Sequence, residues 1–209
     1  GLVGSEMCIR DSNMTLSSVE LLNEESVPKD AAAIIINAPQ KDFNKNDAQK
    51  VIDYLQKGGK AIIVGMHSET EMPNFASILD TYGVSLTTGP IADNDAQHYY
   101  NMGGPLYLLP NVNSSSYTGS LSGGYVYLPI SLGINYPQNS TTDDTESTEE
   151  SKTTYTSLLD TSDDAVAKNN PNSMQDYGYE DGDDKGPFSV GLAVEDKVDD
   201  DHTTQLVVI

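Results

Sequence analysis

Two apolar runs, residues 31–37 (AAAIIIN) and 60–66 (KAIIVGM), frame a stretch with helical periodicity. Both runs are rich in β-branched residues and lack polar alternation, which is typical of strands buried on both faces of a helix-covered parallel sheet. Between them, apolar residues recur at i, i+3, i+4 and i+7, the spacing of one helix face. These residues are Ala48, Val51, Ile52 and Leu55. The three segments together predict a right-handed βαβ unit.

The predicted helix has recognisable boundaries. Asn44 is a suitable N-cap, and Asp47 three residues later supplies a carboxylate at the positive end of the helix. Gly58 and Gly59 provide a left-handed stop. A second helix is expected over residues 73–82, because apolar residues repeat there with the same spacing after an initial proline.

The rest of the chain has weaker patterns. Further strands are expected at residues 84–87, 105–109, 125–130, 188–194 and 205–209, and acidic loops at residues 137–153 and 169–185. We therefore predict an α/β fold with a Rossmann-like wound, mostly parallel sheet and flanking helices. A single domain over residues 13–209 is expected to contain it.

Both ends of the sequence are unusual. Residues 1–12 (GLVGSEMCIRDS) match no periodic pattern and no secretory signal, and they resemble translated read-through of a sequencing adaptor. We treat them as an artefactual leader and exclude them, with Cys8, from fold reasoning. At the other end, the apolar run 205–209 is followed by no turn or cap. These features predict a fragment that is truncated at both ends.

Composition excludes several kinds of partner. The 209 residues include 32 acidic and 11 basic side chains, for a formal net charge of -21. This charge argues against binding to nucleic acid or to an anionic membrane surface, since both are bound through Lys and Arg. No apolar run approaches the roughly 20 residues that span a bilayer. One cysteine allows neither an internal disulfide nor a cysteine-rich metal site.

Several sequence blocks occur in an order that resembles the soluble region of GldG-like proteins. The blocks are residues 27–39 (VPKDAAAIIINAP), the capped helix, residues 54–60 (YLQKGGK), 79–84 (LDTYGV), 157–162 (SLLDTS) and 185–194 (KGPFSVGLAV). GldG-like proteins are auxiliary components of ABC-type transport systems linked to gliding motility and export. The resemblance implies an architecture related to class I glutamine amidotransferases and to the GIFT domains of intraflagellar transport. It also implies a position outside the cytoplasmic membrane, membrane association through helices that this fragment lacks, and an ABC permease and ATPase as partners.

The sequence gives little support for catalysis. An amidotransferase uses a Cys, His and Glu triad, but no cysteine remains once residues 1–12 are excluded. Ser or Thr could replace the cysteine. The segment 119–123 (GSLSG), however, carries leucine at the centre of what would be a G-x-S-x-G elbow. The three histidines stand singly along the chain.

Metal and nucleotide motifs are also missing from the sequence. The acidic stretch 176–184 (DYGYEDGDD) suggests calcium, but an EF-hand starting there would need Gly and Glu where the chain has Asp181 and Pro187. A solvated loop is the favoured interpretation, and weak calcium binding stays open. No glycine-rich phosphate loop follows the first predicted strand. We therefore expect no metal site and no cofactor.

The leading hypothesis is a non-enzymatic, extracytoplasmic binding or scaffolding domain of an ABC transport complex. The alternatives are a degenerate amidotransferase-like hydrolase that uses Ser or Thr, and a protein that binds a solute or glycan. Any ligand is expected at the carboxyl edge of the sheet, where wound α/β folds bind ligands. The candidate residues there are Asn37, Gln40, His67 and Thr161.

Overall fold

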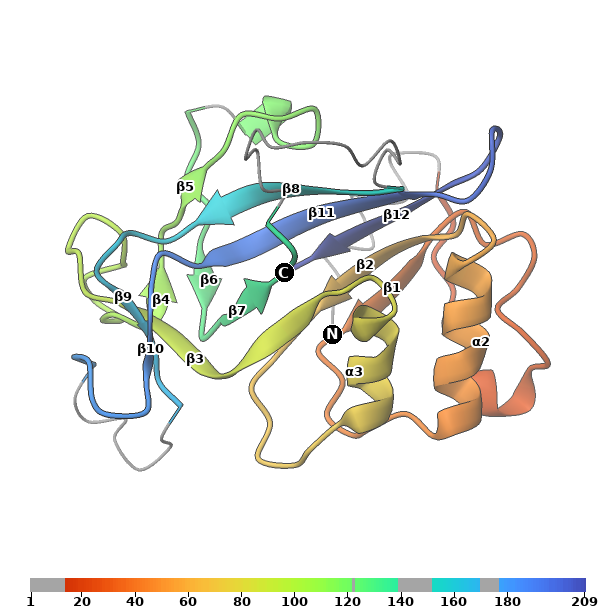
Figure 1. Cartoon of the computed structure of the whole chain (residues 1–209), viewed down its shortest axis with the longest axis horizontal. Helices are drawn as coiled ribbons and strands as arrows, with labels where there is room; N and C mark the ends of the chain where they lie inside the picture. Colours follow the sequence, from red (N-terminus) through yellow and green to blue (C-terminus); the bar gives the residue numbers. More distant parts are fainter. Residues whose placement is uncertain (1–13, 122, 139–151, 170–176) are drawn as a thin grey trace, which may run out of the picture.

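A computed structural model describes residues 14–121, 123–138, 152–169 and 177–209. Figure 1 shows one large curved sheet with two α-helices side by side against one of its faces. The α-helices are α2 (Lys45–Leu55) and α3 (Pro73–Asp80), and short 3-10 turns occur at η1 (Leu21–Asn23) and η2 (Gly119–Leu121). The strands are β1 (Ile34–Asn37), β2 (Lys60–Val64), β3 (Ser85–Asp93), β4 (Tyr107–Leu108), β5 (Asn111–Val112), β6 (Leu128–Pro129), β7 (Leu132–Asn135), β8 (Thr153–Asp160), β9 (Ala165–Ala167), β10 (Asp184–Lys185), β11 (Ser189–Lys197) and β12 (Thr203–Val208).

The large sheet is mixed. Its order is β1-β2-β12-β11-β7-β3-β9-β10, with β8 also paired to β11 and β5 paired to β8. Strands β1, β2 and β12 run parallel to one another, whereas the other described pairs are antiparallel. The antiparallel pair β4 and β6 forms a separate small sheet.

The structure confirms the predicted βαβ unit. Strands β1 and β2 pair in parallel, and Ile34 lies opposite Ala61. The helix between them begins where expected, because the Asn44 side-chain oxygen accepts a hydrogen bond from the backbone N–H of Asp47 at 2.8 Å. Gly58 follows the helix with a positive φ of 87°, as a left-handed stop requires.

The predicted wound, mostly parallel sheet with flanking helices is wrong. The described chain is mostly β, with a half-barrel mixed sheet and α-helices on one face only. Strands β3 and β8 are rich in Ser and Thr, so the sequence suggested only short strands and loop in these regions. In the structure, both strands extend the sheet through antiparallel pairs. Beyond α3, no described segment forms an α-helix that could cover the second face.

The main hydrophobic core lies between the two helices and the sheet. Leu55 of α2, Ile78 of α3, Ile63 of β2 and Leu206 of β12 are buried within one cluster. Full burial of each such side chain is worth about 1.5–3 kcal/mol. A second, smaller cluster, which includes Ile91 and Val190, lies elsewhere in the sheet.

Some predicted features involve residues that the structure does not describe. The leader 1–12 and most of the acidic loop 137–153 lie outside the described residues. The acidic segment 169–185 is described only at residue 169 and from residue 177 onward. No helix in the described part of the chain is long and apolar enough to cross a bilayer.

Candidate functional site: a groove at the carboxyl edge of the parallel strands

The parallel strands β1, β2 and β12 end at one edge of the sheet. There the backbone N–H of Ala38 donates to the carbonyl of Val64 at 3.0 Å, and the N–H of Gly65 donates to Ile209 at 2.7 Å. These bonds hold together the segments that leave the strands. The loop after β2 therefore starts from a fixed position before it leads into α3.

A groove of about 360 Å³ lies beside this edge, between the β2–α3 loop, α3 and the start of β3. Its interior is apolar. Phe75 and Leu79 come from α3, Val84 precedes β3, and Leu132 belongs to β7; all four are buried. Met66, which is 38% exposed, adds a flexible apolar side chain to the lining.

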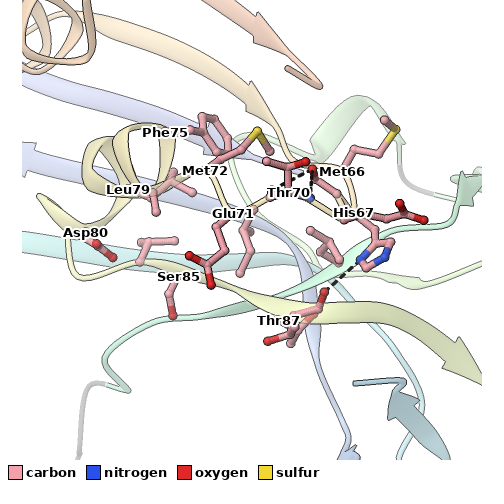
Figure 2. A pocket seen from close by; sticks show the side chains of 17 residues that line it. Met66, His67, Thr70, Glu71, Met72, Phe75, Leu79, Asp80, Ser85 and Thr87 are labelled. Carbon is pink, nitrogen blue, oxygen red and sulfur yellow. Dashed lines mark hydrogen bonds between the residues drawn. The ribbon is translucent and has the colours of Figure 1, made fainter. Parts of the chain in front are cut away.

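The carboxylates that line the groove come from Glu69, Glu71 and Asp80. Figure 2 shows His67 toward one end and Asp80 toward the other, with the Glu71 carboxylate between them. Glu69 also lines the groove, whereas no Lys or Arg is among the described residues that do so. No hydrogen bond or ion pair with another described residue engages the carboxylates of Glu69, Glu71 or Asp80. The groove therefore combines an apolar interior with three unpaired negative charges.

His67 is held in one orientation by the neighbouring strand. Its Nδ1 lies 3.0 Å from the backbone oxygen of Thr88 in β3. Because a carbonyl oxygen only accepts, Nδ1 carries the proton in this hydrogen bond. In the neutral ring, Nε2 is then left as an acceptor.

Helix α3, which forms one wall of the groove, is capped by a residue from a different loop. The Asp42 carboxylate accepts hydrogen bonds from the backbone N–H of Asn74 at 3.1 Å and of Phe75 at 2.8 Å. Partial burial opposes the charge of Asp42, but these hydrogen bonds outweigh it and hold the pKa of this carboxyl below its ordinary value. Asp42 thus ties the β1–α2 loop to the first turn of α3.

The four residues predicted at the carboxyl edge do not form one cluster. His67 lines the groove, whereas Asn37 and Gln40 are exposed and are not among its lining residues. The Gln40 amide donates to the backbone of Ala38 at 3.1 Å. Thr161 lies at a second hollow of about 710 Å³, where it is buried and accepts a hydrogen bond from the Phe188 N–H at 2.9 Å. This hydrogen bond gives Thr161 a structural role.

The sequence reasoning missed the acidic and methionine residues of the groove. Glu69, Glu71 and Met72 lie in the segment that joins β2 to α3. The rule that led to His67, that βα loops at the carboxyl edge carry binding residues, also applies to the five residues after it. The segment HSETEM was therefore the available signal.

Serine side chains come together away from the histidines. The Ser157 hydroxyl donates to the Asp160 carboxylate at 2.5 Å, and its oxygen lies 2.9 Å from the Ser189 hydroxyl. The histidines have other partners. His67 is hydrogen-bonded to Thr88, and His202 is hydrogen-bonded to Asp199. His98 is hydrogen-bonded to Asp95 and Asn111. Among the described residues, no serine is therefore hydrogen-bonded to a histidine that could act as its base.

The described part of the acidic segment 169–185 is held by a lysine. The Lys168 ammonium lies 2.6 Å from Asp183 and 3.3 Å from Glu180, and it donates to the backbone oxygen of Gly178 at 2.7 Å. Burial opposes the lysine charge, but the two carboxylates outweigh it and raise the pKa of Lys168. A bound cation at this position would compete with the ammonium group. No group of three or more potential metal ligands is found among the described residues.

No helix or strand of the described residues covers the face of β1 and β2 opposite α2 and α3. Because strand side chains alternate, Ile34 and Ile36 contact the helix-side core while Ile35 points to the other face. Ile35 is 50% exposed, and its register partner Ile62 is 40% exposed. Val207 on β12, the register partner of Ile62, is partly buried and packs against the second hydrophobic cluster. The apolar run 31–37 predicted a strand buried on both faces, but only the helix-side face of β1 is buried.

Comparisons with known proteins show a likeness of fold. No known family and no curated protein matches the chain. Among solved structures, the chain is similar to one described as "mmIFT52 N-terminal domain", with a TM-score of 0.59 and 12% sequence identity. The match covers 98% of this chain and 76% of that chain. At this identity the similarity shows a shared fold alone.

Proposed function

We propose that this chain is a non-enzymatic, extracytoplasmic binding or scaffolding domain of an ABC transport complex. In this proposal it contacts its partner through the uncovered face of β1 and β2. The carrying observation is the exposure of Ile35 and Ile62, paired isoleucines in a sheet whose other face is covered by helices. Exposed apolar patches on a folded domain are typical of sites that another protein covers.

The position of β1 in the sheet supports the same surface. It is the end strand of the described sheet order, with β2 as its described pairing partner. Natural sheets protect such edges with charges, proline or bulges. Residues 31–37 contain no charged residue and no proline. Together, the unprotected edge and the apolar face present one continuous surface suited to a protein partner.

The partner in this proposal is the permease of an ABC system, and ATP hydrolysis falls to a separate subunit. Support for this choice comes from the ordered GldG-like blocks, which include the β1–α2–β2 unit that carries the surface. The net charge of -21 favours a protein partner over nucleic acid or an anionic lipid surface. The location that follows is the outer side of the bacterial cell membrane.

Co-purification tests the proposal. The protein is expressed with the permease and ATPase of an ABC system, and retention of these subunits is compared for the wild type, Ile35→Lys and Ile62→Lys. Leu22→Lys is the matched control, because Leu22 is 76% exposed and lies outside the sheet. We expect both isoleucine variants to lose the partners while the control keeps them. Failure of the wild type to purify with either subunit would overturn the proposal.

The hydrolase alternative has its own test. A fluorophosphonate probe that labels active-site serines is applied to the folded chain, and the labelled peptide is identified by mass spectrometry. Stoichiometric labelling of Ser157 or Ser189 would favour the enzyme, because these serines form the described hydroxyl cluster. We expect no labelling above the level of the urea-unfolded protein.

A further inference from the structure

The groove beside α3 has a chemistry that the proposed scaffolding role does not use. Its interior is apolar, and methionines Met66 and Met72 line it. Methionine side chains adapt to different apolar partners because they are flexible and polarizable. The volume of about 360 Å³ is near the lower end for ligand pockets, so it suits a few side chains and not a folded domain.

The charges around this groove all have one sign. Glu69, Glu71 and Asp80 line it, are exposed, and form no described ion pair. Some described carboxylates elsewhere have basic partners, such as Asp47 with Lys50 and Asp200 with Lys197, whereas these three have none. Three unpaired carboxylates around an apolar groove create a negative potential that attracts a cation.

We propose that the groove binds a basic amphipathic segment of a partner protein. Apolar side chains of that segment occupy the space above Phe75, Leu79 and Leu86, and its Lys or Arg side chains pair with the carboxylates of Glu69 and Glu71. Complementary charge selects the partner and speeds its association, while apolar burial supplies affinity. This inference rests on the proposed function, because it assumes that the chain acts by binding other proteins.

His67 adds a polar contact to the same site. Because its Nδ1 donates to Thr88, its Nε2 is the ring atom left for a bound segment. A lysine ammonium or a backbone N–H of that segment can donate to it. The groove therefore offers acceptors from the carboxylates and from this ring nitrogen, which again favours a donor-rich cationic occupant.

Fluorescence anisotropy provides the test. The probe is a fluorescein-labelled amphipathic helix of Lys, Leu and Ala, titrated with the 209-residue protein at low salt. Two comparison peptides replace Lys by Glu or Leu by Ser. Glu69→Gln/Glu71→Gln is compared with Glu24→Gln/Glu25→Gln, an exposed pair outside the groove that gives the same change in net charge. Unchanged melting temperatures establish that each variant is folded.

The expected result separates the groove from general charge attraction. The Glu69/Glu71 variant loses affinity for the Lys–Leu peptide by about tenfold or more, whereas the Glu24/Glu25 variant changes by less than about twofold. Both comparison peptides bind more weakly than the probe. Equal losses in the two variants, or equal binding of the Leu→Ser peptide, would show a non-specific polyanion and overturn the inference.

Other occupants are outcomes of the same experiment. Full displacement of the probe by hexylamine at a matched concentration would assign the groove to a small amine. Dimerisation that Glu69→Gln/Glu71→Gln abolishes would assign it to a second copy of the chain. Either result, or absence of wild-type binding, overturns the peptide proposal. The co-purification test depends on Ile35 and Ile62, which lie outside the groove. If the transport complex forms but the peptide does not bind, the groove proposal is wrong and the scaffolding proposal is unaffected.

Discussion

The ammonium of Lys168 lies 2.6 Å from the Asp183 carboxylate, and both side chains are fully buried. The pair joins the end of β9 to an acidic segment 15 residues later in the chain. Asp183 also accepts hydrogen bonds from the backbone N–H groups of Asn169 and Glu180. One carboxylate oxygen accepts from Asn169, and the other accepts from both Lys168 and Glu180. Both oxygens of this buried charge are therefore hydrogen-bonded, as buried charges require.

Removing one member of this pair is expected to destabilise the fold. Lys168→Met leaves the Asp183 charge buried and without its partner, which should lower the free energy of unfolding by about 3–5 kcal/mol. Urea unfolding followed by circular dichroism measures the change. Lys197→Met is the control, because the Lys197–Asp200 pair is exposed and such pairs contribute about 0–1 kcal/mol. Equal effects of the two substitutions would contradict the assigned role.

Asp42 is expected to make stability depend on pH. Its folded pKa lies below the ordinary value of 3.8, so its contribution is complete above that value and is lost as pH falls through the folded pKa. Asp42→Ala should cost about 0.5–2 kcal/mol at neutral pH, the usual loss for a capping residue. The difference from wild type should shrink in acid, where Asp42 is protonated.

Urea unfolding at several pH values measures this difference. Asp30→Ala is the control, since Asp30 is exposed and makes no described side-chain hydrogen bond or ion pair. A cost for Asp42→Ala that stayed constant from neutral pH to well below 3.8 would show that the carboxylate charge is not the cause.

Gly89 is expected to tolerate no side chain. A Cβ atom there would lie 1.6 Å from the backbone oxygen of Lys168, so β3 and the end of β9 would have to separate. We expect Gly89→Ala to lower the free energy of unfolding by about 3 kcal/mol, the upper part of the range for overpacking. Gly119→Ala is the matched control, because nothing lies within 4 Å of its Cβ position. A neutral Gly89→Ala would mean that the two strands pack less closely than described.

Asn44 is expected to stabilise the start of α2 through its capping hydrogen bond, besides the hydrogen bond that its amide nitrogen donates to the Asp47 carboxylate at 2.6 Å. Its side-chain oxygen accepts the Asp47 N–H, and Asn44→Ala removes this acceptor from the start of α2. The expected loss is about 1 kcal/mol, while Asn44→Ser, which keeps a capping oxygen, should stay close to wild type. Thermal unfolding distinguishes the two variants. Equal melting temperatures for Ala and Ser would exclude a capping contribution.

The part of the fold that sequence could predict is its most local part. The apolar spacing that ends at Leu55, the Asn44 cap and the two isoleucine-rich runs identified the β1–α2–β2 unit, because each depends on neighbours along the chain. The burial of both strand faces was predicted incorrectly. A run of isoleucines has the same pattern whether its second face is covered by helices or, as for Ile35, left exposed.

Long-range contacts account for the remaining errors. The groove needs Leu132 of β7 beside α3, and no periodic pattern specifies that contact. Lys168 and Asp183 look like ordinary charged loop residues until the fold buries them together. His67 was identified at the site because it directly follows a predicted strand. Thr161 was placed at the same edge by analogy with a wound sheet, and the antiparallel strands place it at another hollow.

Strand β12 lies between β2 and β11, so the middle of the sheet is contributed by residues 203–208. On the ribosome, the β1–α2–β2 unit emerges about 140 residues before the strand that joins it to the remaining sheet. During that interval its inner edge is open to incorrect pairing with other nascent chains. A chaperone that shields Lys60–Val64 until synthesis passes residue 208 would therefore raise the yield of correctly folded protein.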